Sequence, residues 1–513
     1  MNELMKFNNK EQSENFKCKV TTPSGVIHCD KDNGTPITLH GFLPFFTQFI
    51  YSTGQFENLI DSCPLKYKSN NAPEVKDVLG TAMLSVLSGH TRYSHATSLY
   101  GDEVAADILG LNKIVSHDSI ERGFDKLKSE EAEIWLKEAY WKMFEPLLKI
   151  PYILDIDPTV KTLYGHQENA EVGYNPQKPG RKSHCLHTYF IGSLRIVLDV
   201  VVLPGNQTAG KYSHARLWSL LKEMSQEMRP RLIRGDIGFG NEGTMTGCEN
   251  LSQNYLFKLK QTKTIKTLIF SLETPGHQWV DAGEGWMGCE TEIMLSGWSR
   301  RRRVVILRRK HSKKTTELKQ LKEDNQLEFN LDIVAYNKED FFEYQILVTN
   351  TDYDIRALAQ LYRDRGDCEN TFDELKNQWG WGGFNSNNII RAQIMMRFIG
   401  LIYNWWNVFC RLAEPNRHIE GRTSRRLYQN TAGRLVKSAR SKIFYISAIG
   451  SKAKEVLKKF VKISDFISLN VSTATQLSAE EKWAMVLREA FKKFTYIDRI
   501  KAVTNGSQYL LDL

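Results

Sequence analysis

Two aspartates follow strand-like runs in the middle of the chain, and the pattern between them limits the fold more than any other feature. Asp157 ends the run 152–157, and Asp236 follows the run 231–235 and precedes a glycine-rich turn. Between them the periodicity predicts strands at 184–190 and 194–203 and an amphipathic helix at 214–228. In an α/β sheet built in that order, the first and last strands can lie side by side. We therefore expect both carboxylates at one edge of the sheet.

The run 361–376 carries an aromatic residue and charges of both signs. At about 100° per residue, Tyr362, Arg365, Glu369 and Lys376 fall on one stripe of a helix. Such a stripe suits a surface that meets both a metal ion and a phosphate backbone. The alternative is a solvated helix held by charge pairs four residues apart, and the spacing alone does not separate the two.

The charge balance favours a polyanionic partner. Lys and Arg number 69 against 59 Asp and Glu, giving a net charge of +10 and an isoelectric point near 9.0. Basic residues crowd the stretch 300–322, which begins with Arg300, Arg301 and Arg302 just after Trp298. Basic residues beside an aromatic ring predict phosphate contact with base stacking, and a solvated basic face is the alternative.

The cysteines and the apolar runs argue against a secreted or membrane protein. The eight cysteines are far apart and form no Cys-x-x-Cys pair, so we expect reduced thiols and a cytoplasmic location. His184 and His187 point to opposite faces of a strand, which disfavours a zinc site. The chain starts without an apolar signal segment. The run 394–410 is shorter than the ~20 residues of a membrane span and contains polar residues, so it predicts a buried helix.

These patterns divide the chain into six expected regions. A short helix from Asp118, carrying Arg122, Lys126 and Lys128, marks the N-terminal helices as a candidate for DNA binding. The expected regions are an N-terminal arm at 1–40, a helical DNA-binding region at 41–148, the first part of a catalytic core at 149–240, a β-rich insertion domain at 241–350, the second part of the core at 351–412, and a helical C-terminal region at 413–513 that serves dimerisation.

Acids on two strands and one helix, Asp157, Asp236 and Glu369, resemble the DDE triad of transposases and retroviral-type integrases. The sequence around each aspartate adds to the likeness. Asp157, Pro158 and Thr159 resemble the first-aspartate motif of one group of these enzymes, although Ser or Ala is commoner in place of the proline. The stretch 234–239 resembles its second-aspartate motif, and 173–176 also fits.

The helix motif narrows the resemblance to one group. Tyr362, Arg365, Glu369 and Lys376 reproduce the spacing of the Tyr-Arg-Glu-Lys signature of a large group of bacterial insertion-sequence transposases. The likeness spans about 150–410. It implies a ribonuclease-H-like α/β core interrupted by the β-rich insertion domain, with helical regions on either side.

The resemblance also implies an activity and its partners. Asp157, Asp236 and Glu369 would bind Mg²⁺ or Mn²⁺, with two ions expected, because carboxylates without His or Cys suit hard cations. The enzyme would cleave double-stranded DNA at the terminal inverted repeats of an insertion sequence and join the freed 3′-hydroxyl to target DNA, working as a homodimer in a synaptic complex. Tyr362, Arg365 and Lys376 would contact DNA near the scissile bond. In members that form a DNA hairpin, a flipped base stacks on a tryptophan, and Trp298 and Trp286 are the candidates.

The sequence leaves several alternatives open. Asp155 shares a strand face with Asp157, and Asp373 follows Glu369 by one helical turn, so that either could be the ligand instead. A metal-dependent nuclease that cuts without joining and an inactive DNA-binding regulator derived from a transposase remain alternative functions.

Overall fold

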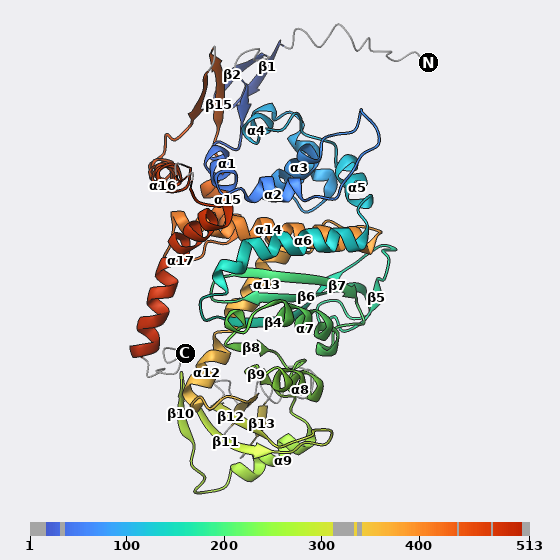
Figure 1. Cartoon of the computed structure of the whole chain (residues 1–513), viewed down its shortest axis with the longest axis vertical. Coiled ribbons are helices and arrows are strands. Elements are labelled where there is room, and N and C mark those ends of the chain that lie inside the picture. The colour runs from blue at the N-terminus through green and yellow to red at the C-terminus, as the bar shows by residue number, and fades with distance from the viewer. Residues whose placement is uncertain are drawn as a thin grey trace.

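We describe a computed structural model of the 513-residue chain. The structure describes residues 17–30, 36–310, 333–335, 341–438, 441–472, 474 and 476–504. In Figure 1 the molecule is elongated, with the N-terminal helices at one end, the large sheet in the middle and its outer strands at the other end. The part of the basic stretch beyond Lys310 lies outside the described residues.

One mixed sheet runs through most of the molecule. Its strand order is β10-β11-β12-β14-β9-β8-β4-β6-β5, with β7 paired to β6 and β13 to β14. The half that carries the aspartates consists of β4 (Ile153–Thr162), β5 (Glu171–Val172), β6 (Lys182–Ile191), β7 (Ile196–Pro204), β8 (Leu232–Gly235) and β9 (Tyr255–Lys258). β4, β8 and β9 are parallel, whereas β6 and β7 run antiparallel to their neighbours. The strand of Asp157, β4, and the strand before Asp236, β8, are therefore neighbours, as predicted.

β4 is longer than the sequence predicted. It does not end at Asp157 but continues through Pro158 to Thr162. β8 ends opposite Ile156, so β4 has no neighbour on that side from Asp157 onwards. A proline is tolerated at an unpaired strand edge because its missing N–H removes no hydrogen bond there.

The strands of the expected insertion continue this same sheet. They are β10 (Val280–Gly283), β11 (Trp286–Ile293), β12 (Arg302–Lys310), β13 (Ile333–Ala335) and β14 (Phe341–Thr349), and β14 pairs with β9. Two helices, α8 (Glu242–Asn250) and α9 (Lys263–Leu272), were not predicted. The domain boundary at 240 remains a prediction, since hydrogen bonds cross from β9 to β14 without interruption.

The buried helix α14 (Ile389–Ala413) explains the polar residues inside its apolar run. Together with α6 (Ser129–Phe144) it covers β7, as Figure 1 shows. The Asn404 amide bonds both the N–H and the carbonyl of Val197 (2.9 and 2.7 Å), and Arg397 pairs with Asp199 (2.8 Å). Asn404 thus satisfies backbone groups at the free edge of β7 that would otherwise be buried and unpaired, and Arg397 balances the charge of the buried Asp199. Among the described residues, no helix is both long and apolar enough to cross a membrane.

The N-terminal helices agree with the predicted pattern except at one cap. They are α1 (Leu43–Ser52), α2 (Gln55–Asp61), α3 (Val75–Leu87), α4 (Glu103–Ile108) and α5 (His117–Asp125). α5 begins after Ser116 rather than at Asp118, because the Ser116 hydroxyl accepts from the N–H of Ser119 (3.2 Å). The arm expected at 1–40 contains a hairpin, β1 (Lys17–Thr22) and β2 (Gly25–Asp30).

The C-terminal region is less helical than predicted. Between α15 (Gly421–Tyr428) and the helices α16 (Ser451–Ile467) and α17 (Ala479–Thr504) lies a hairpin of β15 (Gly433–Ser438) and β16 (Ser441–Ile446). β15 pairs with β3 (Ile37–Thr38) from the other end of the chain. The partner strand is distant in sequence, so local periodicity gave no signal for this small sheet.

Candidate active site

Asp157 lies on β4, and Asp236 directly follows the adjacent parallel strand β8. β4 and β8 pair in register up to Ile156 opposite Gly235. The two aspartates are the next residue along each chain, at the point where the pairing of the strands ends. The N–H of Gly238 donates to Oδ1 of Asp236 (2.9 Å) and fixes that carboxylate at the start of the turn.

Asp155 is already paired. Arg234, which lies opposite it in the register, donates through Nε to Oδ1 (2.6 Å) and through Nη2 to Oδ2 (2.9 Å). The side chains of Arg234 and Asp155 are only 3% and 1% exposed. Nη1 of Arg234 donates to the carbonyl of Leu361. Because both oxygens of Asp155 are used by Arg234, the geometry favours Asp157 as the carboxylate available for chemistry.

The run 361–376 forms two helices instead of the single one we predicted. α12 (Ile355–Arg363) is capped by Asp364, and α13 (Gly366–Gln378) begins after its N-cap, Arg365. The prediction that Tyr362 shares one helical stripe with Glu369 is therefore wrong. The run contains no proline, and a single glycine such as Gly366 can be accommodated inside a helix at a modest cost. The sequence pattern therefore did not reveal that the helix breaks here.

Arg365 sits at the break and connects two of the acids. Its Nη2 lies 2.9 Å from Oδ1 of Asp157, and its Nη1 donates to Oε1 of Glu369 (2.6 Å). The Arg365 side chain is only 8% exposed, whereas that of Glu369 is 65% exposed. The guanidinium was expected on DNA phosphates, but in this structure it neutralises the carboxylates.

The charge around Asp157 is unbalanced. Burial raises the pKa of the Asp157 carboxyl to about 7, Arg365 opposes the shift, and the negative charges of Asp236 and Glu369 add to it. The phenol of Tyr362 is half-buried at the end of α12, and burial is the main reason why its pKa is also raised. Carboxylates that crowd one another so closely disfavour ionisation until a cation joins them.

The structure distinguishes between Glu369 and Asp373 as the acid that α13 contributes to the site. Asp373 is exposed and accepts from the Asn377 amide (2.6 Å), one turn beyond Glu369 and about two turns beyond Arg365. The negative charge of Glu369, in contrast, lies close enough to raise the pKa of Asp157. Lys376 is half-buried, and burial lowers the pKa of its ammonium group. The geometry thus brings Asp157, Asp236, Glu369 and Arg365 together, with Tyr362 close to them on α12. Lys376 lies two turns beyond Glu369 on α13.

The donor set suits a hard divalent cation, although it is not assembled as a ligand cage. The oxygens of Asp157, Asp236 and Glu369 are all carboxylate oxygens, the ligand type that Mg²⁺ prefers. Within the part of the chain that the structure describes, no three His, Cys, Asp or Glu residues already form a group that could hold a metal. The Arg365 guanidinium lies between Asp157 and Glu369 and supplies positive charge there.

Two residues expected on DNA are buried in the extended sheet. Trp298 is 9% exposed, with the Arg302 guanidinium 5.3 Å from its ring centre. The Arg302 side chain is 2% exposed and pairs with Glu242 (2.6 Å) and Glu249 (2.7 Å). Its charge is therefore already balanced inside the protein, which contradicts a direct DNA contact by Arg302. A ring so covered is also unavailable as a stacking platform.

The remaining candidates of that stretch differ in exposure. Trp286 is 3% exposed beneath Arg309 (4.7 Å), so it too belongs to the core. Arg300 is 58% exposed at 3.4 Å from Glu249, and the exposed Arg301 donates to the carbonyl of Glu292 (2.6 Å). Arg300 and Arg301 stay predictions as DNA contacts.

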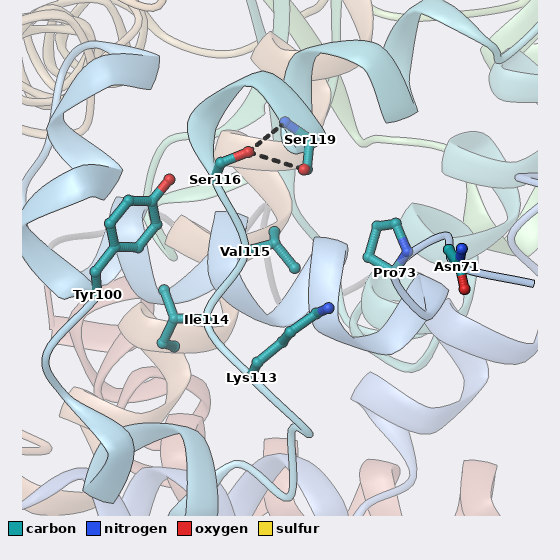
Figure 2. Close-up of a pocket in the computed structure, with 8 residues that line it drawn as sticks. All are labelled: Asn71, Pro73, Tyr100, Lys113, Ile114, Val115, Ser116 and Ser119. Carbon is teal, nitrogen blue, oxygen red and sulfur yellow. Dashed lines mark hydrogen bonds between the residues drawn. The ribbon is translucent and has the colours of Figure 1, made fainter.

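A shallow hollow of about 440 Å³ lies among the N-terminal helices, apart from the carboxylates. Figure 2 shows it beside the start of α5, where the Ser116 hydroxyl bonds both the backbone and the side chain of Ser119. The cap is satisfied internally, and Lys113 and Tyr100 line the opening. Binding of DNA by this region remains a prediction.

A buried lysine on the strand of Asp157 was not predicted. Lys161 is 2% exposed, and its Nζ donates to the carbonyl of Gly383 in the loop that follows α13. Burial lowers the pKa of Lys161 to about 7. The same loop docks on the N-terminal helices, since the N–H of Phe384 donates to the carbonyl of Thr91 (2.5 Å). Lys161 therefore joins β4 to the segment that positions α13.

This lysine predicts a pH dependence of stability. Between pH 7 and the ordinary lysine pKa near 10.4, the unfolded chain binds a proton that the folded chain does not. The free energy of unfolding should therefore rise with pH across this window. Denaturant midpoints from pH 6.5 to 10 are expected to show this rise in the wild type and a flatter profile in Lys161→Met. Parallel profiles would show that Lys161 is charged in the folded protein.

Comparison with known proteins identifies the family to which the chain belongs. The sequence model of Transposase DDE domain group 1 matches residues 66–466. The chain belongs to this family of DDE transposases. No curated protein matches the chain.

A solved structure is also similar to the chain. The cryo-EM structure of a piggyBac transposase synaptic complex with hairpin DNA matches over 90% of this chain and 88% of that one. The identity is 10% and the TM-score is 0.34. At that TM-score the likeness supports no residue-level argument.

Proposed function

We propose that the protein is a cut-and-paste DNA transposase of a bacterial insertion sequence, of the group with the Tyr-Arg-Glu-Lys signature. It would cleave DNA at the two ends of its element and transfer the freed 3′-hydroxyl into target DNA. The observation that carries the proposal is the position of Arg365, which contacts both Asp157 and Glu369. Acids from β4 and α13 therefore converge beside the end of β8, where Asp236 lies.

We assign Asp157, Asp236 and Glu369 as the catalytic and metal-binding carboxylates. Bound Mg²⁺ or Mn²⁺ would activate the attacking oxygen and stabilise the leaving oxygen of an in-line displacement. The ribonuclease-H-like core would thus consist of β4, β6, β7, β8 and β9 with α13 and α14, and the strands beyond β9 would form the insertion. The raised pKa of Asp157 supports the assignment, because crowded carboxylates favour cation binding.

The protein side chains would bind and orient the DNA. Arg365 balances the carboxylates in the structure described here, and it becomes available for a phosphate group when cations take over that charge. Lys376, half-buried on the same helix, would hold a phosphate next to the scissile bond. Two DNA ends processed together call for a homodimer, for which the C-terminal helices α16 and α17 are our candidate contact.

The experiment is an in vitro reaction with end-sequence DNA taken from the flanks of the gene. Purified protein in Mg²⁺ should nick the element ends and should insert a pre-cut 3′-hydroxyl end into a plasmid. Cleavage without insertion would favour the nuclease alternative. Tight end binding with neither reaction, in Mg²⁺ or Mn²⁺, would overturn the proposal in favour of an inactive regulator.

A further inference from the structure

Three exposed tyrosines lie on two segments of the chain, one after β4 and one after β7. Tyr164 and Tyr174, on the loop between β4 and β6, are 71% and 70% exposed, and Tyr212, after β7, is 36% exposed. Each of two rings is paired with a cation: Arg181 lies 5.8 Å from the ring centre of Tyr164, and Lys211 lies 4.9 Å from that of Tyr212. We call these three tyrosines with Arg181 and Lys211 the tyrosine surface.

The first loop is held rigidly although its side chains face solvent. A Cβ atom on Gly173 would lie 1.9 Å from the carbonyl oxygen of Gly205, so the two backbones touch and no other residue fits at 173. On the other side of Tyr174, Asn175 is buried and its amide donates to Thr162 Oγ1 (3.0 Å). Tyr174 is therefore presented outward from a backbone fixed on both sides.

The second loop, residues 205–213, connects the tyrosine surface to the turn that follows Asp236. Gly205 belongs to this loop, and a Cβ on Gly210 would lie 2.4 Å from the carbonyl oxygen of Gly238 in that turn. The N–H of Gly238 bonds the Asp236 carboxylate. His187 anchors the middle of the loop, since its Nε2 lies 2.6 Å from the carbonyl of Gln207. Backbone contacts thus run without a gap from the Tyr174 loop to Asp236.

The charge of the two loops fits a polyanion. The segments 163–182 and 205–213 carry Lys178, Arg181, Lys182 and Lys211 against Glu168 and Glu171. One of these acids is already engaged, because Glu168 Oε2 accepts from the N–H of Ile389 (3.0 Å). Exposed aromatic rings beside cations bind nucleic acid by base stacking and phosphate contact. Rigid loops that present such rings lose little entropy on binding.

We propose that the tyrosine surface binds the DNA strand that continues past the scissile or acceptor phosphate. The inference rests on the proposed function and adds to it the place where DNA outside the element's end lies. That DNA is either the donor flank during cleavage or the target during joining, and both present the same chemistry of bases and phosphates. Trp298 and Trp286 do not compete for this role because both are buried.

The test replaces Tyr164, Tyr174 and Tyr212 with alanine together. The matched control is Tyr445→Ala, because Tyr445 is 49% exposed on β16 and pairs with Arg434 at 5.1 Å. Fluorescence anisotropy measures the affinity for end DNA with and without a flank, and for a target duplex. Removal of the stacked rings should weaken binding of the flanked end or of the target by about tenfold or more, while the end without a flank binds within twofold of the wild type.

The outcomes distinguish donor DNA from target DNA, and they test the tyrosine surface independently of the proposed transposase function. Loss confined to the flanked end assigns the surface to donor DNA, and loss confined to the target duplex assigns it to target DNA. Equal affinity of the triple variant and the wild type for both would overturn the inference, as would an equal loss in Tyr445→Ala. The binding readout needs no catalysis, so a wild type that binds but neither cuts nor joins would count against the proposed function alone.

Discussion

Glu369→Gln is expected to lower end cleavage by about 10³-fold or more while binding of end DNA changes little. A metal-held displacement gains several kcal/mol of transition-state stabilisation from its carboxylates, and each ~1.4 kcal/mol corresponds to a factor of ten. Glutamine keeps the size of the side chain but removes the charge that Arg365 and a cation would share. Because the Glu369 side chain is 65% exposed, the substitution should not disturb folding.

Asp373→Asn is the matched control for this prediction. Asp373 lies on the same helix one turn later, is exposed, and bonds Asn377 rather than Arg365. Gel assays of nicking in Mg²⁺ should find Asp373→Asn within a few-fold of the wild type. Equal losses in both variants, or retained cleavage in Glu369→Gln, would contradict the assignment of Glu369.

Arg234→Met is expected to cost about 3–5 kcal/mol of stability. Removing one partner of a buried ion pair leaves the other charge uncompensated, here Asp155 at 1% exposure. It also removes the donor to the Leu361 carbonyl, the residue just before Tyr362. Arg234 therefore links β4, β8 and the end of α12, the elements around the site. Denaturant unfolding measures the loss, with Arg356→Met as a control, because its pair with Asp281 is exposed (70% and 62%) and should contribute less than about 1 kcal/mol.

The double variant Arg234→Met/Asp155→Leu separates stability from positioning. An apolar pair of similar volume replaces the buried charges, so most of the lost stability should return. End cleavage should stay low, because nothing then ties the Leu361 carbonyl to β8. Recovery of full cleavage along with stability would show that the pair has no positioning role. A single variant as stable as the wild type would contradict the buried pair itself.

Much of the catalytic half of the fold follows from local pattern. The strand that carries Asp157, the strand that precedes Asp236 and the buried helix around 394–410 are where the sequence pattern predicted them. In these segments the burial of one face decides the structure, and that face is visible in the residue order. The polar residues within α14 were also evident in the sequence, but the hydrogen bonds from Asn404 to the backbone of β7 were not.

The features that the sequence could not reveal depend on contacts between distant residues. At the break between α12 and α13 the Arg365 guanidinium turns inward to Asp157, more than 200 residues earlier. Arg302 looked like a DNA contact in the basic stretch, and only its pairing with Glu242 and Glu249 shows otherwise. Of the three exposed tyrosines, only Tyr174 lies in a stretch that the sequence singled out, and the loops that carry them are related only through backbone contacts.

The central claim is that acids on β4, β8 and α13 share divalent cations. Fe²⁺ bound in place of Mg²⁺, with ascorbate and peroxide, generates hydroxyl radicals that cut the backbone next to the metal. Mass spectrometry of the fragments should find cuts near Asp157, Asp236 and Glu369 together, suppressed by excess Mg²⁺ and absent in Asp236→Asn. Cuts at only one of these positions, or cuts that Mg²⁺ does not suppress, would contradict a shared metal site.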